Sequence, residues 1–467
     1  MDNIEQIFTE TQQRRMRRRT TYERITGSGT ISAAVMVVAA ILAVICANTD
    51  AYESIHGLLM APIFFGVGDL AAALSVEVFV NDFLMAIFFL LVGIELKYEI
   101  CVGELRQPRR ALLPMLAAVG GVVVPACIFA LVNRGGAVHG WAIPMATDIA
   151  FALGVMALLG NRVPAGVRVF FSTLAIADDL IAIVAIALFY GQSPDLLWLV
   201  AAAAVTIALA ALNRTQHIRL APYILLGLLL WFCLFQSGVH ATLAGVILAF
   251  CVPAGSGLKL ENLAGWLEEE AAPALDEQFD EESHVLGQHE FTHAAAGVER
   301  VMHRATPPLI RLERYISTPV SFVILPIFAF VNAQVRLVGV DLVALALDPV
   351  AIGVYLGMLV GKPVGIFSVT ALMVRFGLSE LPERVTLGHI MGVGVLGGIG
   401  FTMSILISGL AFPGDPFNLL AAKAAILAGS VTAGPPWPGG RARLNAWPGG
   451  HARCGAGPAE VGRGRGK

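Results

Sequence analysis

Long apolar segments dominate this chain and limit what it can fold into. Crossing about 30 Å of hydrocarbon as a helix takes roughly 20 apolar residues. Hydrophobic residues make up 57% of the 467 residues and charged residues only 14%, whereas a soluble domain needs about 25% charged residues to cover its surface. Apolar stretches of sufficient length recur at 31–48, 79–101, 111–132, 140–160, 167–190, 195–213, 221–236, 239–253, 316–335, 349–373, 385–411 and 418–434. The pattern predicts an all-α polytopic membrane protein with about twelve transmembrane helices in a lipid bilayer.

Basic residues predict the orientation of these helices, because cytoplasmic loops carry an excess of Lys and Arg. Residues 1–30 form a basic tail containing Arg14, Arg15, Arg17, Arg18 and Arg19. Alternate loops are also basic, through Lys97, Arg106, Arg109, Arg110, Arg162, Arg168, Arg214, Arg219, Arg375 and Arg384. The loops between them carry only Arg134 and Arg336. We therefore expect both ends of the chain in the cytoplasm.

The formal net charge of −3 argues against nucleic acid as a partner.

Two polar segments complete the organisation. The first eight spans lie in 31–253 and the last four in 311–434, and an acidic, histidine-rich loop at 254–310 separates them. We predict a partly helical cytoplasmic loop there. A metal site built from His284, His289, His293 and His303 is the alternative, although their spacing matches no zinc-finger or HExxH pattern. Residues 435–467 form an irregular tail rich in Pro, Gly and Arg, which we interpret as the product of a reading-frame change near residue 431.

Charged residues inside the spans are candidates for function, since a lone charge in the bilayer is costly. Asp178 and Asp179 lie in the middle of the fifth span. Neighbours on a helix point about 100° apart, so both carboxylates can border one cavity but cannot point the same way. Two adjacent carboxylates in a dry site cannot both be ionised without a counter-charge. Either one holds a proton or a cation lies between them, which suits an exchange of protons for a small hard cation.

Breaks in the helical pattern accompany two further charges. Asp148 follows Pro144 and Thr147 in the fourth span, and Lys362 follows Gly361 in the tenth. An acid and a base in interrupted segments predict broken helices whose dipole ends need compensation. A third interruption, the glycine-rich stretch 392–404, allows either irregular backbone against a cavity or close packing of helices. The fourth and eleventh spans are the middle members of two three-span units, 111–190 and 349–434, that enter from opposite sides and predict an inverted repeat.

Other ionisable residues lie nearer the expected cytoplasmic face. Glu95 and Glu99 end the second span, and Glu313 precedes the ninth. They either bind protons at the mouth of a funnel or act as interfacial anchors. His240 can titrate near neutrality, or it is a hydrogen-bonded core histidine.

These residues resemble the NhaA-type Na+/H+ antiporter family. The resemblance lies in the stretches 81–97, 146–154, 238–245, 325–332, 361–363 and 397–404, and in Ala175-Ile-Ala-Asp-Asp179. It runs from about residue 20 to 430 and is interrupted by 255–306. The loop is longer and more acidic than in compact members of the family, and the last helix lacks its end.

The resemblance implies a fold and an activity. The fold has twelve helices in the inner membrane of a bacterium, with inverted repeats and two crossing discontinuous helices. The activity is pH-dependent export of Na+ or Li+ driven by H+ entry, with no cofactor, in a monomer or homodimer. Asp178 and Asp179 then carry the cation and the proton, Asp148 and Thr147 line the crossing, and Lys362 pairs with a site aspartate. Glu95, Glu99, Glu313 and His240 belong to the pH response.

Two rival functions use other features of the sequence. A sodium-coupled symporter of the same fold class needs a polar substrate pocket, and few polar residues are left to build one. An intramembrane aspartyl protease is the enzymatic alternative, because Gly66-Val-Gly-Asp69 and Pro273-Ala-Leu275 match two of its motifs. Its catalytic pair comes from two facing helices, however, whereas Asp178 and Asp179 are neighbours on one. We therefore expect a secondary transporter and not an enzyme.

Overall fold

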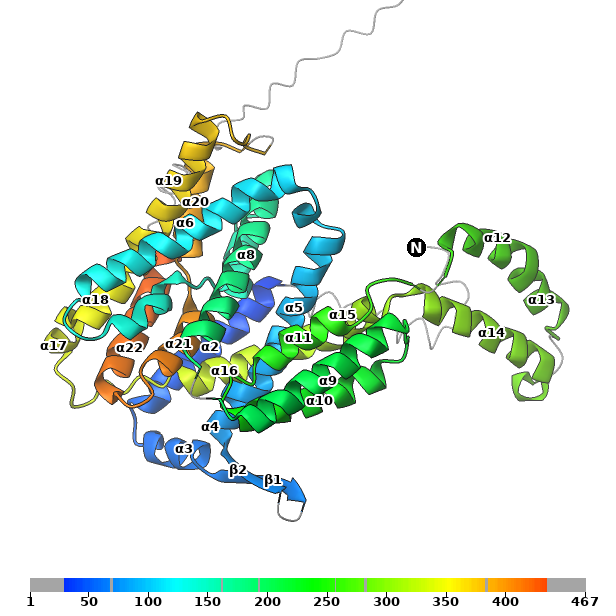
Figure 1. Cartoon of the computed structure of the whole chain (residues 1–467), viewed down its shortest axis with the longest axis horizontal. Coiled ribbons are helices and arrows are strands. Elements are labelled where there is room, and N and C mark those ends of the chain that lie inside the picture. Colours follow the sequence, from blue (N-terminus) through cyan, green and yellow to red (C-terminus); the bar gives the residue numbers. More distant parts are fainter. Residues whose placement is uncertain are drawn as a thin grey trace, which may run out of the picture.

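Helices make up most of the part of the chain that the structure describes. The structure, a computed structural model, describes residues 29–434 apart from 68–69, 161–162, 192–193, 257, 281–283 and 383–384 (Figure 1). The basic tail 1–28, the tail 435–467, Arg162 and Arg384 lie outside the described residues. The reading-frame hypothesis and the orientation based on the basic tail remain predictions.

The N-terminal region contains two spans and a β-hairpin. Helix α2 (Gly29–Ala47) is followed by α3 (Ala51–Leu59), strands β1 (Pro62–Val67) and β2 (Leu70–Ser75), and the short helix α4 (Val76–Val78). The antiparallel strands pair from Pro62 with Ser75 to Val67 with Leu70. A π-helical turn at Phe79–Leu84 then leads into α5 (Met85–Cys101). Residues 51–75 therefore form no span, in agreement with the gap between the first two predicted spans, but the hairpin was not predicted.

The first three-span unit contains the first broken element. It consists of α6 (Pro108–Val132), a 3-10 helix at Val138–Met145, α7 (Ile149–Leu158) and α8 (Ala165–Phe189). Two peripheral helices follow, α9 (Leu196–Arg214) and α10 (Leu220–Ser237), and then α11 (Leu243–Cys251). With nine residues, α11 is only about 14 Å long. The prediction of a full span at 239–253 is therefore wrong.

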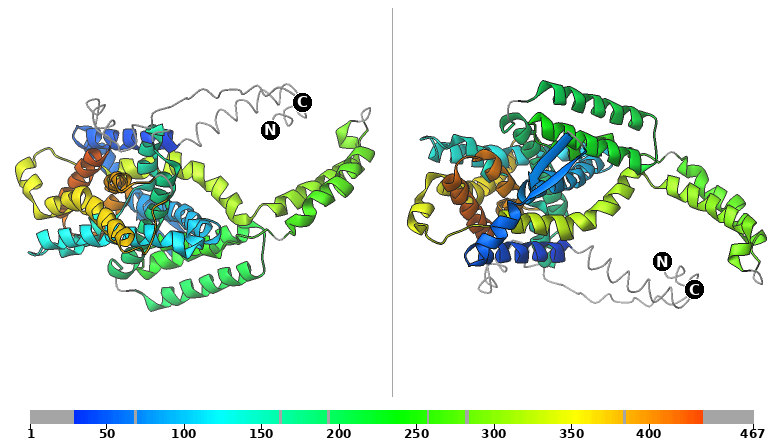
Figure 2. Two further views of the ribbon diagram at one scale, coloured as in Figure 1. Left: turned by 90° about the horizontal axis from the view of Figure 1, so that it is seen from above. Right: turned by 90° about the horizontal axis from the view of Figure 1, so that it is seen from below.

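The loop between the eighth and ninth predicted spans forms a helical arm. Its helices are α12 (Leu263–Trp266), α13 (Ala272–Glu277) and α14 (His289–Ala305). Both figures show the arm projecting away from the rest of the helices (Figures 1 and 2). The bundle resumes with α15 (Pro308–Pro319), a π-helical turn at Val320–Ile324, α16 (Leu325–Asn332) and the short α17 (Leu342–Leu347). The ninth span therefore begins at Pro308, earlier than the predicted residue 316.

The second three-span unit contains the second broken element. It consists of α18 (Pro349–Leu356), α19 (Lys362–Arg375), α20 (Leu387–Gly397), α21 (Phe401–Ala411) and α22 (Pro416–Ala433). Helices α20 and α21 are bent by 49° at their break. The expected interruption at Lys362 is wrong, because a π-helical turn at Gly357–Gly361 joins α18 to α19 in one 27-residue span. A π-turn absorbs an extra residue without ending the hydrogen-bonded ladder, so Gly361 and Pro363 cause no break.

The first helices of the two units run in opposite directions. Along their contact, Phe129 of α6 lies against Gly353, Pro125 against Gly361 and Gly120 against Gly365. A Cβ atom on Gly365 would lie 2.1 Å from the carbonyl oxygen of Gly120, so the two backbones touch. Such small-residue contacts allow membrane helices to approach closely. The antiparallel order confirms the opposite entry sides that the inverted repeat requires.

The number of crossings agrees with a polytopic membrane protein. Among the described residues, ten helical segments are long and apolar enough to cross a bilayer, and the bent pair α20–α21 brings the number to 11. The short helix α11 accounts for the remaining predicted segment. Many large apolar side chains point outward along these helices, as lipid-facing residues do.

Candidate functional site: the crossing of two broken helices

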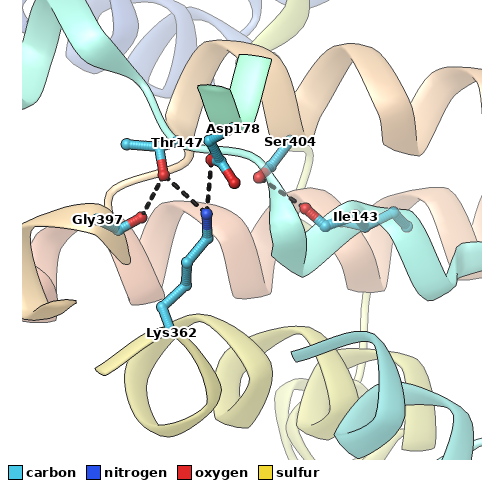
Figure 3. A network of polar contacts seen from close by, with 6 residues as sticks. All are labelled: Ile143, Thr147, Asp178, Lys362, Gly397 and Ser404. Atoms are coloured by element: carbon cyan, nitrogen blue, oxygen red, sulfur yellow. Dashed lines mark hydrogen bonds and ion pairs between the residues drawn. The ribbon is translucent and has the colours of Figure 1, made fainter. Parts of the chain in front are cut away.

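Two interrupted segments cross in the interior and are joined by hydrogen bonds. The backbone N–H of Asp148 donates to the Ile399 carbonyl at 2.7 Å. The Thr147 hydroxyl donates to the Gly397 carbonyl at 2.9 Å, and the Ser404 hydroxyl donates to the Ile143 carbonyl at 2.8 Å (Figure 3). These bonds supply partners for backbone N–H and C=O groups that have no helical hydrogen bond at the breaks. Irregular backbone at this depth is stable only where protein or water provides such partners.

Asp148 holds the N-terminal ends of both half-helices. Its Oδ1 accepts from the Phe151 N–H at 3.0 Å at the start of α7. Its Oδ2 accepts from the N–H of Thr402 at 3.1 Å and from the Thr402 hydroxyl at 2.7 Å, at the start of α21. Each helix N-terminus carries a partial positive charge of about +0.5. The negative charge of Asp148, whose residue is 2% exposed, is therefore balanced by two helix ends.

Lys362 reaches the crossing from α19 and pairs with Asp178. Its Nζ lies 2.6 Å from Asp178 Oδ2 and donates to the Thr147 hydroxyl at 2.8 Å (Figure 3). The Lys362 and Asp178 side chains are 0% and 1% exposed. A buried ion of either sign requires a partner of opposite charge. Asp178 and Lys362 therefore neutralise each other.

Asp179, the next residue on α8, has no such partner. Its Oδ1 is buried without a hydrogen-bond donor among the described residues. Asp179 lines a cavity whose walls do not include Asp178, so the two neighbouring carboxylates face different surroundings, as helix geometry predicts. Within the described part of the chain, Asp179 is the one charged side chain at the crossing with neither an ion-pair partner nor a helix end to balance it. It must bind a proton or a cation to remain buried at low cost.

The cavity connects Asp179 with acidic residues farther along the bundle. Its volume is about 440 Å³. The side nearest the crossing is formed by Thr147, Asp148, Ile149, Ala150, Asp179, Thr402 and Met403. The other side is formed by α2, α5 and α15, with Glu95, Tyr98, Glu99 and Glu313 among its lining residues. The cavity therefore gathers six of the nine predicted site residues, namely Thr147, Asp148, Asp179, Glu95, Glu99 and Glu313.

The three remaining predicted residues lie outside the lining. Asp178 and Lys362 lie directly behind it at the crossing. His240 is separate, in the turn before α11 beside the backbone of Tyr190, and its Nε2 is buried without a hydrogen-bond partner among the described residues. The structure does not bring His240 to the acidic cavity.

The comparison with known proteins agrees with this geometry. A family model described as Na+/H+ antiporter 1 matches residues 23–435. The chain belongs to this family. It is 42% identical over 404 residues to the Na+/H+ antiporter NhaA of Oleidesulfovibrio alaskensis, covering 86% of this chain and 89% of the relative. NhaA of Helicobacter pylori is 42% identical over 403 residues, with 85% and 89% covered. Na+/H+ antiporter NhaA 1 of Pseudomonas putida is 42% identical over 405 residues, with 86% and 90% covered.

Two residues of this Na+/H+ antiporter family member have contacts that the sequence analysis did not predict. Thr402 lines the cavity and holds Asp148 through both its hydroxyl and its N–H. Its position just after a glycine-rich break is the signal that could have identified it, since the start of a helix presents free N–H groups. Lys97 donates to the Phe250 carbonyl at 2.8 Å and also to Val252, and so holds the C-terminal end of α11. Nothing in the sequence indicated that α11 ends beside α5.

Proposed function

We propose that the chain exports Na+ in exchange for H+ and that Asp179 carries both ions in turn. The observation behind this assignment is the charge balance at the crossing. Asp178 is paired with Lys362 and Asp148 with two helix ends, whereas Asp179 has no compensating charge and faces the cavity. An ionised Asp179 attracts a cation, and a protonated Asp179 does not.

Competition for Asp179 then couples the two ion movements. Na+ and H+ neutralise the same carboxylate, so binding of one excludes the other. A bare carboxylate is too costly in the membrane interior to move often. Alternating access of the loaded site to the two sides of the membrane therefore exchanges one ion for the other.

Asp178, Lys362 and Thr147 have supporting roles in this proposal. Lys362 holds Asp178 neutralised at 2.6 Å while Asp179 is loaded. Thr147 ties the Lys362 ammonium to the end of α20 through the Gly397 carbonyl. This arrangement supports a cycle in which Lys362 changes its partner as the charge on Asp179 changes.

The acidic cavity is proposed as the cytoplasmic entrance. Glu95, Glu99 and Glu313 line it, and their charges raise the local concentration of cations near Asp179. We propose that proton binding at these three residues contributes to the pH response. His240 is proposed to act independently of them, because it lies away from the cavity.

Several further properties remain part of the proposal. The relatives are named as antiporters, which supports a secondary transporter without enzymatic activity and without a resident cofactor. The family also supports an inner-membrane location with a cytoplasmic N-terminus, Li+ as a second cargo and a homodimer. Flux with Li+ in place of Na+, and the mass of the purified protein in detergent, test the last two.

Proteoliposomes provide the central test. Addition of Na+ outside acidified vesicles should drive H+ movement in the wild type, and Asp179→Asn should lower the rate at least about 100-fold, because an amide neither ionises nor exchanges a proton. Arg336→Gln, which changes an exposed surface residue, is the control for reconstitution. Unchanged exchange in Asp179→Asn would refute the assignment.

The proposal also predicts a pH dependence with a definite sign. Protons compete with Na+ for Asp179, so lowering the pH should raise the apparent KM for Na+. The rise should approach about tenfold per pH unit while the carboxylate is mostly protonated. Initial rates measured against Na+ concentration between pH 6 and pH 9 test it. A KM independent of pH contradicts competition at a single carboxylate.

A further inference from the structure

The hydroxyl groups at the crossing differ in how their lone pairs are used. A hydroxyl has one hydrogen to donate and two lone pairs that accept. Thr147 donates to the Gly397 carbonyl and accepts from the Lys362 ammonium. Ser404 donates to the Ile143 carbonyl and is absent from the cavity lining. Ser404 therefore presents no oxygen to the cavity, and the Thr147 oxygen lies against a positive charge, which weakens it as a ligand for a cation.

Thr402 is different. Its hydroxyl hydrogen is directed to Asp148 Oδ2 at 2.7 Å, and its N–H donates to the same oxygen at 3.1 Å. No described residue donates a hydrogen bond to the Thr402 hydroxyl oxygen. Thr402 lines the cavity together with Asp179, and the residue is 2% exposed. The two bonds to Asp148 therefore fix the position of the Thr402 oxygen, whose lone pairs are not used by any described residue.

A nearby carboxylate strengthens this oxygen as a ligand. Hydrogen bonds in series polarise one another, so donation to the charged Asp148 increases the negative partial charge on the Thr402 oxygen. Hard cations prefer oxygen ligands such as carboxylates, hydroxyls and water. Asp179 Oδ1 supplies the unpartnered carboxylate in the same cavity.

We infer that the Thr402 hydroxyl oxygen is a direct ligand of the transported cation, alongside the Asp179 carboxylate. This inference rests on the proposed Na+/H+ exchange and adds a ligand to it. Asp148 acts as a positioning residue that orients the hydroxyl, and water completes the coordination. The Thr147 hydroxyl accepts from the Lys362 ammonium, which makes it the weaker ligand of the two threonines while that contact is made.

Because a proton on Asp179 needs no hydroxyl ligand, loss of the Thr402 oxygen should weaken cation binding and leave proton binding intact. Thr402→Val replaces the hydroxyl by a methyl group of similar size. We expect it to raise the KM for Na+ about tenfold at high pH, the effect of losing one charge-assisted contact. The kcat should stay within about threefold, because saturating Na+ refills the site. Thr402→Ser should restore the KM to within about threefold of the wild type, because it keeps the oxygen.

Thr370→Val is the matched control. The Thr370 residue is also fully buried, but its hydroxyl donates to the Ile366 carbonyl within α19 and does not line the cavity. We expect its KM for Na+ to match the wild type. Titration of purified protein with Na+ by calorimetry gives the dissociation constant independently of transport, and thermal unfolding verifies that each variant is folded. If Thr402→Val does not fold, Thr402→Ala is measured in its place.

The outcomes separate the inference from the proposed function. Absence of Na+-driven H+ movement in the wild type and in Thr370→Val refutes the exchange itself. Exchange by the wild type, with an unchanged Na+ dissociation constant in Thr402→Val, refutes only the ligand role. A fall in kcat with an unchanged dissociation constant also refutes it, because it assigns Thr402 to positioning Asp148 alone.

Discussion

Helices α8 and α9 are similarly apolar in sequence but lie in opposite surroundings. In α8, 14 of the 25 residues are buried, whereas in α9 only Ala202 and Leu209 of its 19 residues are. The side chains of Leu197 and Ile207 in α9 are 75% and 69% exposed, as expected of a helix that faces lipid. Apolarity therefore determines that a helix crosses the bilayer, but it does not determine whether the helix lies at the centre or the periphery.

Charge distinguishes the two helices, whereas their content of small residues does not, since α9 has seven alanines in 19 residues and α8 has six in 25. The buried positions of α8 include Asp178 and Asp179 between several alanines, and Lys362 neutralises the first of the two. In α9 the described charges are at its ends, Asp195 as the N-cap and Arg214 in the last turn. The central helix thus carries buried charges that need partners, whereas the described charges of the peripheral helix lie at its ends and need none in the interior.

The largest expected effect follows from removing the partner of Asp178. Lys362→Met leaves a buried carboxylate without its counter-charge and should destabilise the fold by about 3–5 kcal/mol. Lys362→Met combined with Asp178→Asn should recover most of that loss, because it removes the orphaned charge as well. Thermal unfolding in detergent at pH 8 measures both. A single variant as stable as the wild type would show that α8 does not depend on this pair.

A smaller effect should follow from enlarging one alanine in each helix. Ala182 of α8 is fully buried, so Ala182→Leu should cost about 1–3 kcal/mol through overpacking. The same change at Ala204, an exposed position of α9, should alter stability by no more than about 0.5 kcal/mol. Unfolding midpoints of the two variants compare the helices directly. Equal losses would mean that α9 is covered by protein and not by lipid.

The smallest effect is expected at the end of α9. Asp195 caps this helix by accepting from the Leu197 N–H at 2.9 Å. Asp195→Ala should reduce stability by about 1 kcal/mol, and the KM for Na+ should not change because the residue is far from the crossing in its contacts. Asp195→Asn keeps the cap and serves as the control. A changed KM in Asp195→Ala would connect the periphery to the ion site.

The sequence predicted the charged residues of the site because charges in apolar segments are conspicuous. Asp148, Asp178, Asp179 and Lys362 stood out in this way, and the structure brings them to one crossing. The sequence did not indicate which aspartate would form the ion pair with Lys362. The pairing depends on how α8 is rotated about its axis relative to α19. Tertiary packing determines that rotation, and the local sequence does not.

Other features were hidden for related reasons. Gly361 and Pro363 suggested a break beside Lys362, but a π-helical turn preserves the helix there. Residue type alone did not distinguish Thr402 from the other hydroxyl residues, because its contact with Asp148 joins residues 254 positions apart. The hairpin of β1 and β2 lay in a stretch with too many glycines to show a regular period. Each of these features depends on contacts or on a backbone adjustment that periodicity does not report.

The contact between Gly120 and Gly365 has a consequence for how the protein moves. Helices whose backbones touch cannot slide along each other without first separating. α6 and α19 therefore travel as a single rigid body, and Lys362 travels with them. The lining of the acidic cavity includes residues of α5 and α15 but none of α6 or α19, so we expect a movement that opens the cavity to displace α5 and α15 relative to this pair.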